Sequence, residues 1–237
     1  MAQNRLTAPL TTWRAGRYAQ NPGAAADAAV VGGTLRPDLA VIAELIAPGS
    51  RVFDVGCGSG DLLAHLKMQR QVIGRGLELS ETGVLACVRR GLSVRQGNLE
   101  TSLLDYPDQA FDYVVLSETL PYLDDPVRTL HEMVRVGRRA IVSFANWGHW
   151  RCRTGLLMTG CLSGDPAHAQ PWYAAPRSRA VSVRDFVRLC HTQNLTIVGQ
   201  HHLAGTRRLR ASWAANLRTT VAIFELETER RNQRCWS

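Results

Sequence analysis

Residues 51–61 read Arg-Val-Phe-Asp-Val-Gly-Cys-Gly-Ser-Gly-Asp, an apolar run that passes into three alternate glycines. The run from Arg51 to Val55 has the length of a buried strand, and Asp61 to Met68 carries leucines at helical spacing. Glycine lacks a Cβ atom, so alternate glycines let the backbone turn sharply and approach a ligand closely. The stretch therefore predicts a strand, a ligand-binding loop and a helix in succession.

The segments on either side of this stretch alternate between strand and helix patterns. The expected strands are 51–55, 71–79, 92–96, 111–116, 139–144, 195–200 and 219–225. The expected helices begin at Pro37, where Pro48-Gly49 ends the first, and then cover 61–68, 81–90, 126–136 and 183–193. A weakly structured stretch is expected from Asn146 to Ala180. Near-continuous apolar strands alternating with helices predict an α/β, Rossmann-like fold, with a doubly wound, mostly parallel, seven-stranded sheet covered by helices on both faces.

The length of 237 residues suits one domain, and 45% hydrophobic with 20% charged residues is a globular composition. Residues 1–34 lack a sustained apolar period, so we expect a flexible extension, a domain over 35–227 and a tail over 228–237. No apolar run approaches the roughly 18 residues of a spanning helix, and the N-terminus lacks the apolar block of a secretory signal. A cytoplasmic, bacterial protein without a membrane partner is therefore expected.

The charge and the cysteines favour neither a nucleic-acid partner nor a metal. The formal charge is +8, yet the arginines are scattered and do not alternate with aromatic residues along one face. The six cysteines show neither C-x-x-C spacing nor histidine pairing at zinc-finger intervals, so free thiols are expected. The basic composition alone therefore does not identify a partner.

Three ligands compete for the glycine loop. A dinucleotide fingerprint would place glycine where Asp61 stands, and its carboxylate would face a pyrophosphate. A P-loop needs a lysine and a longer spacer, both of which are missing. Asp54 suits a ligand with a cationic amino group and a sulfonium, and Glu78 ends the next strand where an acid meets ribose hydroxyls. These features favour S-adenosylmethionine, with a merely tight turn as the structural alternative.

Further candidates follow the third and fourth strands. Asn98 could bind the adenine amino group and Leu99 could cover the ring, although an ordinary turn asparagine is an almost equal alternative. Ser117 and Glu118 leave the fourth strand at the ligand side, with helix capping as the other reading of Glu118. The predicted cofactor-binding residues are Asp54, Gly56, Cys57, Gly58, Gly60, Glu78, Asn98, Leu99 and Ser117.

No catalytic residue is assigned, because methyl transfer to an activated sulfonium carbon depends mainly on positioning and requires no fixed constellation. The polar and aromatic side chains His149, Trp147, Trp172 and Tyr173 are candidates near the ligand. Each is more typical of a structural or lid residue than of a catalyst.

On these residues the chain resembles the MetW family of bacterial methionine-biosynthesis proteins, which has the class I methyltransferase fold. The resemblance covers about 35–227 and is most specific at Val136-Gly137-Arg138-Arg139-Ala140-Ile141-Val142-Ser143-Phe144, Asn146-Trp147-Gly148-His149-Trp150-Arg151 and Arg184-Asp185-Phe186. It also includes Leu35-Arg36-Pro37-Asp38-Leu39, Pro48 through Gly58, Gly74 through Leu79, Gly91 through Gly97 and Phe111 through Ser117.

The resemblance implies a protein that binds S-adenosylmethionine and supports or regulates homoserine O-acyltransferase. Two alternatives stay open: an active small-molecule methyltransferase, and a cofactor-free scaffold subunit of the acyltransferase. The chain departs from the family pattern at Ser59, where an acid is usual, at Ala174-Ala175 in place of Asp-Thr, and at Arg179 in place of histidine. After Ser117 it reads Glu-Thr-Leu-Pro-Tyr-Leu, where Gln-Thr-Leu-Gln-Ala is usual.

Overall fold

The computed structural model describes residues 35–160, 178–210 and 214–228. The predicted extension over 1–34 and all but the first residue of the tail over 228–237 lie outside these ranges. The α-helices are α1 (Pro37–Leu45), α2 (Asp61–Arg70), α3 (Glu81–Arg89), α4 (Leu99–Ser102), α5 (Pro126–Val136), α6 (Trp150–Thr159), α7 (Val183–Thr192) and α8 (Ala215–Arg218). Two 3-10 turns are η2 (Leu103–Asp105) and η3 (Leu120–Tyr122).

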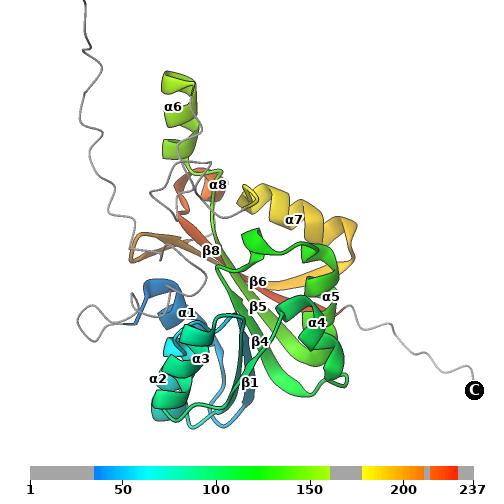
Figure 1. Ribbon diagram of the computed structural model, residues 1–237. Helices are drawn as coiled ribbons and strands as arrows, with labels where there is room; N and C mark the ends of the chain where they lie inside the picture. The colour runs from blue at the N-terminus through cyan, green and yellow to red at the C-terminus, as the bar shows by residue number, and fades with distance from the viewer. Residues whose placement is uncertain (1–34, 161–177, 211–213, 229–237) are drawn as a thin grey trace, which may run out of the picture.

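The strands form one sheet in the order β3-β2-β1-β4-β5-β8-β6-β7 (Figure 1). They are β1 (Arg51–Val55), β2 (Ile73–Glu78), β3 (Val94–Gln96), β4 (Phe111–Ser117), β5 (Gly137–Ala145), β6 (Leu195–Ala204), β7 (Arg207–Leu209) and β8 (Val221–Thr228). The first five pair in parallel, whereas β8 runs antiparallel between β5 and β6. The predicted mostly parallel α/β sheet is confirmed.

The predicted strand number of seven is wrong, because the described sheet contains eight strands. The additional strand, β7, is a three-residue edge strand that pairs antiparallel with the end of β6. Two of its three residues are arginines, so it carries no alternation or apolar run that could indicate a strand. Its partner β6 also continues to Ala204, beyond the predicted end at Gln200.

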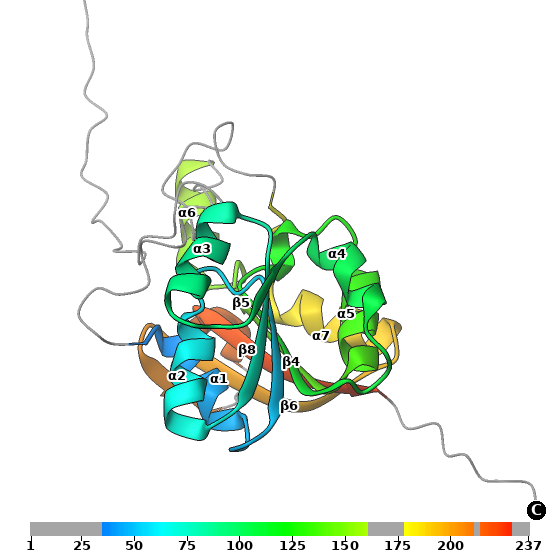
Figure 2. The ribbon, with the colours of Figure 1, turned by 60° about the horizontal axis from the view of Figure 1, so that its bottom comes forward.

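Helices cover both faces of the sheet, as predicted for a doubly wound fold. Figure 2 shows α1, α2 and α3 on one side of the strands and α4, α5 and α7 on the other. The alternation of strand side chains explains this arrangement, since Val52 packs with α1 and α2 while its neighbour Phe53 packs in the opposite cluster. Each central strand therefore contributes to two separate cores.

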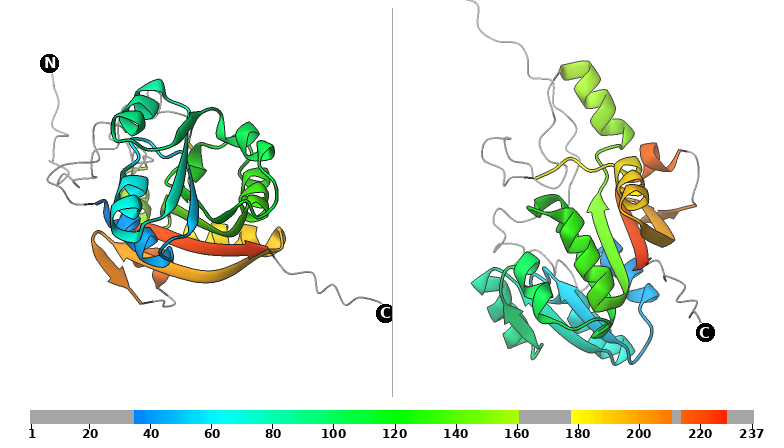
Figure 3. Two further views of the ribbon diagram at one scale, coloured as in Figure 1. Left: turned by 90° about the horizontal axis from the view of Figure 1, so that it is seen from below. Right: turned by 90° about the vertical axis from the view of Figure 1, so that its right-hand side faces the viewer.

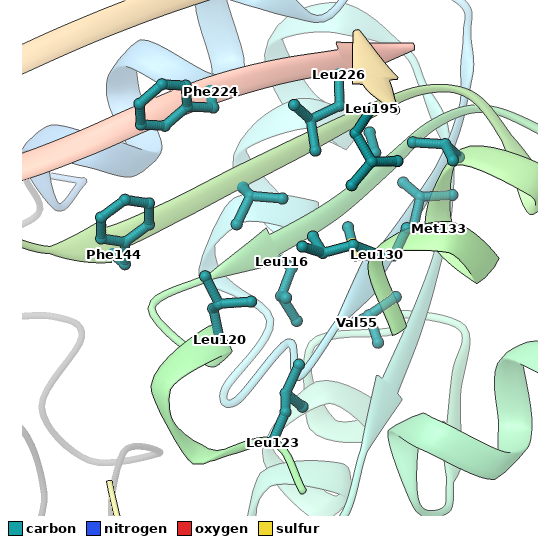
Figure 4. Close-up of a cluster of buried hydrophobic side chains, with 14 of the residues drawn as sticks. Val55, Leu116, Leu120, Leu123, Leu130, Met133, Phe144, Leu195, Phe224 and Leu226 are labelled. Carbon is teal, nitrogen blue, oxygen red and sulfur yellow. The ribbon is translucent and has the colours of Figure 1, made fainter. Parts of the chain in front are cut away.

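The larger core lies between the sheet and the helices α5 and α7. Figure 4 shows Leu130 and Met133 of α5 facing side chains of β4, β5 and β8. At its other end the fully buried rings of Phe144 and Phe224 stack with their centroids 5.8 Å apart. This packing fixes the central strands whose carboxyl ends present the polar residues described below.

Helix α6 forms within the stretch from Asn146 to Ala180 that was predicted to be weakly structured. None of its residues is buried, and it projects away from the body of the molecule (Figure 1 and the right-hand view of Figure 3). His149 caps its first turn by accepting a hydrogen bond from the Arg151 amide, and Gly160 ends it with a φ of +67°. Local capping thus specifies a helix that the apolar periodicity did not indicate.

Candidate functional site

The glycine loop connects β1 to α2 at the carboxyl edge of the parallel strands. Gly56, Gly58 and Gly60 have φ values of +77°, +55° and +77°, which is the left-handed region that favours glycine. The Gly56 and Cys57 amides donate to the Leu77 carbonyl at 2.8 and 3.1 Å, so the loop is held against β2. All three glycines were predicted as ligand-contacting residues, and their geometry suits a close backbone approach.

Glu78 ends β2 beside this loop. Its side chain is buried, and its two carboxylate oxygens accept from the Gly58 amide at 2.8 Å and the Ser80 amide at 2.9 Å. Carboxylate oxygens each offer two lone pairs, so these backbone bonds orient the group and leave acceptor capacity for a further donor. Glu78 ends the second strand, as expected from the sequence, and its contact with ribose hydroxyls stays a prediction.

Asp54 is 3% exposed and lies directly before the loop. Burial raises the pKa of Asp54 to about 7; the positive charge of Arg36 opposes this rise, whereas the charges of Glu78 and Asp61 add to it. An added cation favours the ionised form of a buried carboxylate that lies near two other acids. A ligand that brings a positive charge beside Asp54 would therefore favour the ionised carboxylate.

Ser117, at the end of β4, belongs to a polar network that the sequence analysis missed. Its hydroxyl donates to Asp38 at 3.1 Å, accepts from Arg36, and accepts from Ser143 of β5 at 3.2 Å. Asp38 and Ser143 are buried, and Arg36 forms two hydrogen bonds to the Asp38 carboxylate at 2.5 and 2.7 Å. The available signal was Asp38, an acid within the apolar pattern of the first helix.

Glu118 follows Ser117 in a left-handed conformation with a φ of +53°. Its carboxylate lies 3.9 Å from the Arg36 guanidinium, and its amide donates to the Ser143 carbonyl at 2.8 Å. Asp125, and not Glu118, caps the helix α5, so the capping reading of Glu118 is not reproduced. Non-glycine residues with positive φ gather at functional sites, where the surroundings hold the strained backbone.

Asn98 and Leu99 occupy the turn after β3. The exposed Asn98 side chain caps α4 by accepting from the Glu100 amide at 2.8 Å, which is the turn alternative considered from the sequence. Leu99 is half-buried and packs against the larger core. Their predicted contact with adenine stays a prediction.

The remaining candidates belong to the stretch after β5 and differ in burial and in whether the structure describes them. Trp147 is half-buried and its amide donates to the Val181 carbonyl at 3.0 Å, whereas Trp150 is 48% exposed. Trp172 and Tyr173 lie outside the described residues, as do Ala174 and Ala175. His149 acts as a helix cap, and burial lowers its pKa. His149 therefore caps α6, and the backbone of Trp147 is joined to the segment before α7.

Two residues that depart from the family pattern form hydrogen bonds in the structure. Ser59 donates to Asp61 at 2.8 Å, and Arg90 contacts both that carboxylate and the Ser59 carbonyl. The Arg179 guanidinium binds the Leu123 and Asp124 carbonyls, and so joins the segment before α7 to the turn after β4.

Over residues 35–160, 178–210 and 214–228, no three His, Cys, Asp or Glu side chains gather as a metal site. In the same part of the chain, no helix combines the length and apolarity needed to cross a membrane.

Solved structures place this architecture in a class. A chain from the complex between the Haloferax volcanii Trm112 methyltransferase activator and the putative methyltransferase matches 80% of this chain and 88% of its own length, with a TM-score of 0.59 and 18% identity. An S-adenosylmethionine-dependent methyltransferase of Thermotoga maritima, a possible histamine N-methyltransferase, matches 81% and 91% with a TM-score of 0.56 and 17% identity. The chain has the class I methyltransferase fold.

Comparison of the sequence identifies the family within this fold class. The family model described as methionine biosynthesis protein MetW matches residues 36–226, and the chain belongs to this family. It is also 34% identical over 209 residues to the bifunctional methionine biosynthesis protein MetXA/MetW of Rhodopirellula baltica. The match covers 84% of this chain and 34% of that relative, so the chain spans about a third of the relative's length.

Proposed function

We propose that the chain binds S-adenosylmethionine at the loop from Asp54 to Gly60 and, in this form, supports or regulates homoserine O-acyltransferase. The observation that carries the cofactor proposal is the buried Asp54 carboxylate, whose environment favours a cation. S-adenosylmethionine presents an ammonium and a sulfonium. The three left-handed glycines would allow its close approach, and Glu78 is oriented to accept from ribose hydroxyls.

The network around Ser117 extends the proposed site. Arg36 is held by Asp38 on one side and lies within electrostatic reach of Asp54. A free amino-acid end carries an ammonium and a carboxylate, so Asp54 and Arg36 together have the charges to hold both ends of such a group. Asn98 and Leu99 would meet the adenine. When bound, S-adenosylmethionine would supply an activated methyl group.

The MetXA/MetW relative supports the acyltransferase part of the proposal. A fusion holds two functions on one polypeptide, which raises the effective concentration of one domain at the other. Helix α6 offers a surface for such a partner, because Trp150, Leu157 and Met158 share one helical face and are 48%, 83% and 82% exposed. Arg151 stacks on Trp150 at 5.4 Å, so the apolar face has a basic margin.

Methyl transfer to a small molecule is the second candidate function. The strained Glu118, which lies opposite Arg36 at the end of β4, favours it. Formation of S-adenosylhomocysteine in the presence of candidate acceptors would distinguish this function from cofactor binding alone.

Titration calorimetry tests the cofactor proposal. Wild type should bind S-adenosylmethionine, and Gly56→Val should not, because a Cβ at Gly56 already meets the Thr119 hydroxyl at 2.8 Å and the branched side chain would extend into the approach path. Gly49→Val is the matched control, since Gly49 has a φ of +71° but nothing within 4 Å of an added Cβ and lies outside the loop. Equal binding by all three proteins, or none by wild type, would remove the proposal.

A further inference from the structure

A thiol of the glycine loop lies close to a thiol of helix α3. The Sγ atoms of Cys57, in the loop, and Cys87, on α3, are 3.8 Å apart. Cys57 is half-buried and Cys87 is buried, and both are free thiols. A disulfide has an S–S length of about 2.05 Å, so the two sulfurs need to approach by only about 1.8 Å.

Glycines make room for this pair. A Cβ atom at Gly76 of β2 would stand 2.7 Å from the Cys57 sulfur, and one at Gly60 would stand 2.8 Å from the Cys87 sulfur. Any larger residue at either position would displace a thiol. The fold therefore brings the two sulfurs together from positions 30 residues apart.

The surroundings of the pair shift the pKa values of the two thiols in opposite directions. The hydrogen bond from Cys57 lowers the pKa of Cys87, assisted by the Arg90 guanidinium, while burial and the charges of Asp54 and Glu78 act in the opposite direction. The same hydrogen bond and burial raise the pKa of Cys57. One sulfur can thus ionise while the other keeps its proton, which is the arrangement that oxidation to a disulfide requires.

We propose that Cys57 and Cys87 are a thiol modification site, which a hydroperoxide oxidises to an intramolecular disulfide that weakens cofactor binding. The thiolate attacks one peroxide oxygen, the O–O bond breaks, and a sulfenic acid and hydroxide form. The second thiol displaces the sulfenic oxygen, and the S–S bond forms. Two thiols and one hydrogen peroxide give one disulfide and two waters, so two electrons pass from sulfur to oxygen.

The disulfide acts on the loop through Gly58. In the reduced protein the protonated form of the Cys87 thiol donates to the Gly58 carbonyl at 3.4 Å, and the Gly58 amide donates to Glu78 at 2.8 Å. Oxidation removes the thiol donor and pulls Cys57 toward α3. Both changes displace the segment that orients Glu78, so this part of the inference rests on the proposed cofactor function.

Peptide mapping and calorimetry with S-adenosylmethionine test the inference together. After hydrogen peroxide treatment, non-reducing mass spectrometry should find a peptide pair linked through Cys57 and Cys87. Affinity should fall by at least about tenfold and return with dithiothreitol, a coupling of ordinary size. Cys87→Ser should bind like reduced wild type before and after peroxide, and Cys152→Ser, on α6, should respond as wild type does.

The outcomes separate the two proposals. Thiol loss without the linked peptide would overturn the modification site, and a linked peptide with unchanged affinity would overturn its effect on the loop. If reduced wild type fails to bind the cofactor, the proposed function fails, and the linked peptide alone decides the modification site. Circular dichroism would check the folding of Cys87→Ser. If serine unfolds the chain, Cys87→Ala replaces it and is compared only with itself before and after peroxide, because alanine lacks the donor to the Gly58 carbonyl.

Discussion

The affinity for S-adenosylmethionine should depend on pH through Asp54. Burial raises the pKa of this carboxyl to about 7, so near neutral pH the free protein is a mixture of protonated and ionised forms. A ligand that places an ammonium or sulfonium near Asp54 binds the ionised form. Binding below neutral pH must therefore first remove a proton from the protein.

The size of the effect follows from the ionised fraction. With a pKa of about 7, roughly one protein in ten is ionised at about pH 6 and one in a hundred at about pH 5. The apparent Kd is divided by the competent fraction, so it should be about tenfold weaker at pH 6 and about a hundredfold weaker at pH 5 than at its plateau. Above about pH 8 the affinity should no longer depend on this group.

Calorimetry from about pH 5 to 8.5, in buffers of different ionisation enthalpy, measures both the affinity and the proton released. Asp61→Asn should shift the low-pH limb to lower pH, because the negative charge of Asp61 contributes to the raised pKa of Asp54. Asp54→Asn should bind the cofactor weakly, and its affinity should show no such loss at low pH. A wild-type affinity that is flat over this range, or that rises on acidification, would refute the reasoning.

Four further outcomes are expected. Because the pKa of Asp54 is raised in the folded protein, ionisation of Asp54 destabilises the fold as the pH rises from about 4 to about 7, and below about pH 4 this destabilisation is absent. Urea unfolding should therefore show the stability of Asp54→Asn increasing relative to wild type over this range, by at most about 4 kcal/mol. Gly49→Ala and Gly56→Ala should each lose about 1 kcal/mol, or about 2–4 °C in Tm, with an extra loss at Gly56 that Thr119→Ala relieves. Trp150→Ala with Leu157→Ala should weaken capture of a homoserine acyltransferase in a pull-down and leave cofactor affinity unchanged; full capture would exclude α6 as the surface. A chain starting at Leu35 should melt within a few degrees of the full chain, and a larger loss would show that residues 1–34 stabilise the domain.

The parts of the fold that short-range pattern specifies were predictable from the sequence. The strand, glycine loop and helix from Arg51 to Arg70 form as expected, since periodicity and glycine spacing act over a few residues. The end of the next strand at Glu78 was predictable for the same reason. Local signals failed at β7, which is short and arginine-rich, and at α6, none of whose residues is buried, so that the helix carries no core-facing period.

The network around Ser117 shows why the rest of the site was missed. Arg36 and Ser117 are 81 residues apart, and Asp38 and Ser143 are 105 apart, so only the folded sheet brings them together. The pairing of Cys57 with Cys87 has the same origin. Sequence spacing cannot indicate such contacts, although a buried acid such as Asp38 indicates that a partner exists.

The position of β8 between β5 and β6 has a consequence for synthesis on the ribosome. The parallel half of the sheet, β1 to β5, can assemble as its strands emerge, because each pairs with neighbours already made. Strand β6 emerges before β8 and does not pair with β5 in the described sheet, so its inner edge has no partner strand until β8 is made. Until Val221–Thr228 leave the exit tunnel, the nascent chain therefore carries open strand edges at β5 and β6, and this interval is when binding by a chaperone would protect it most.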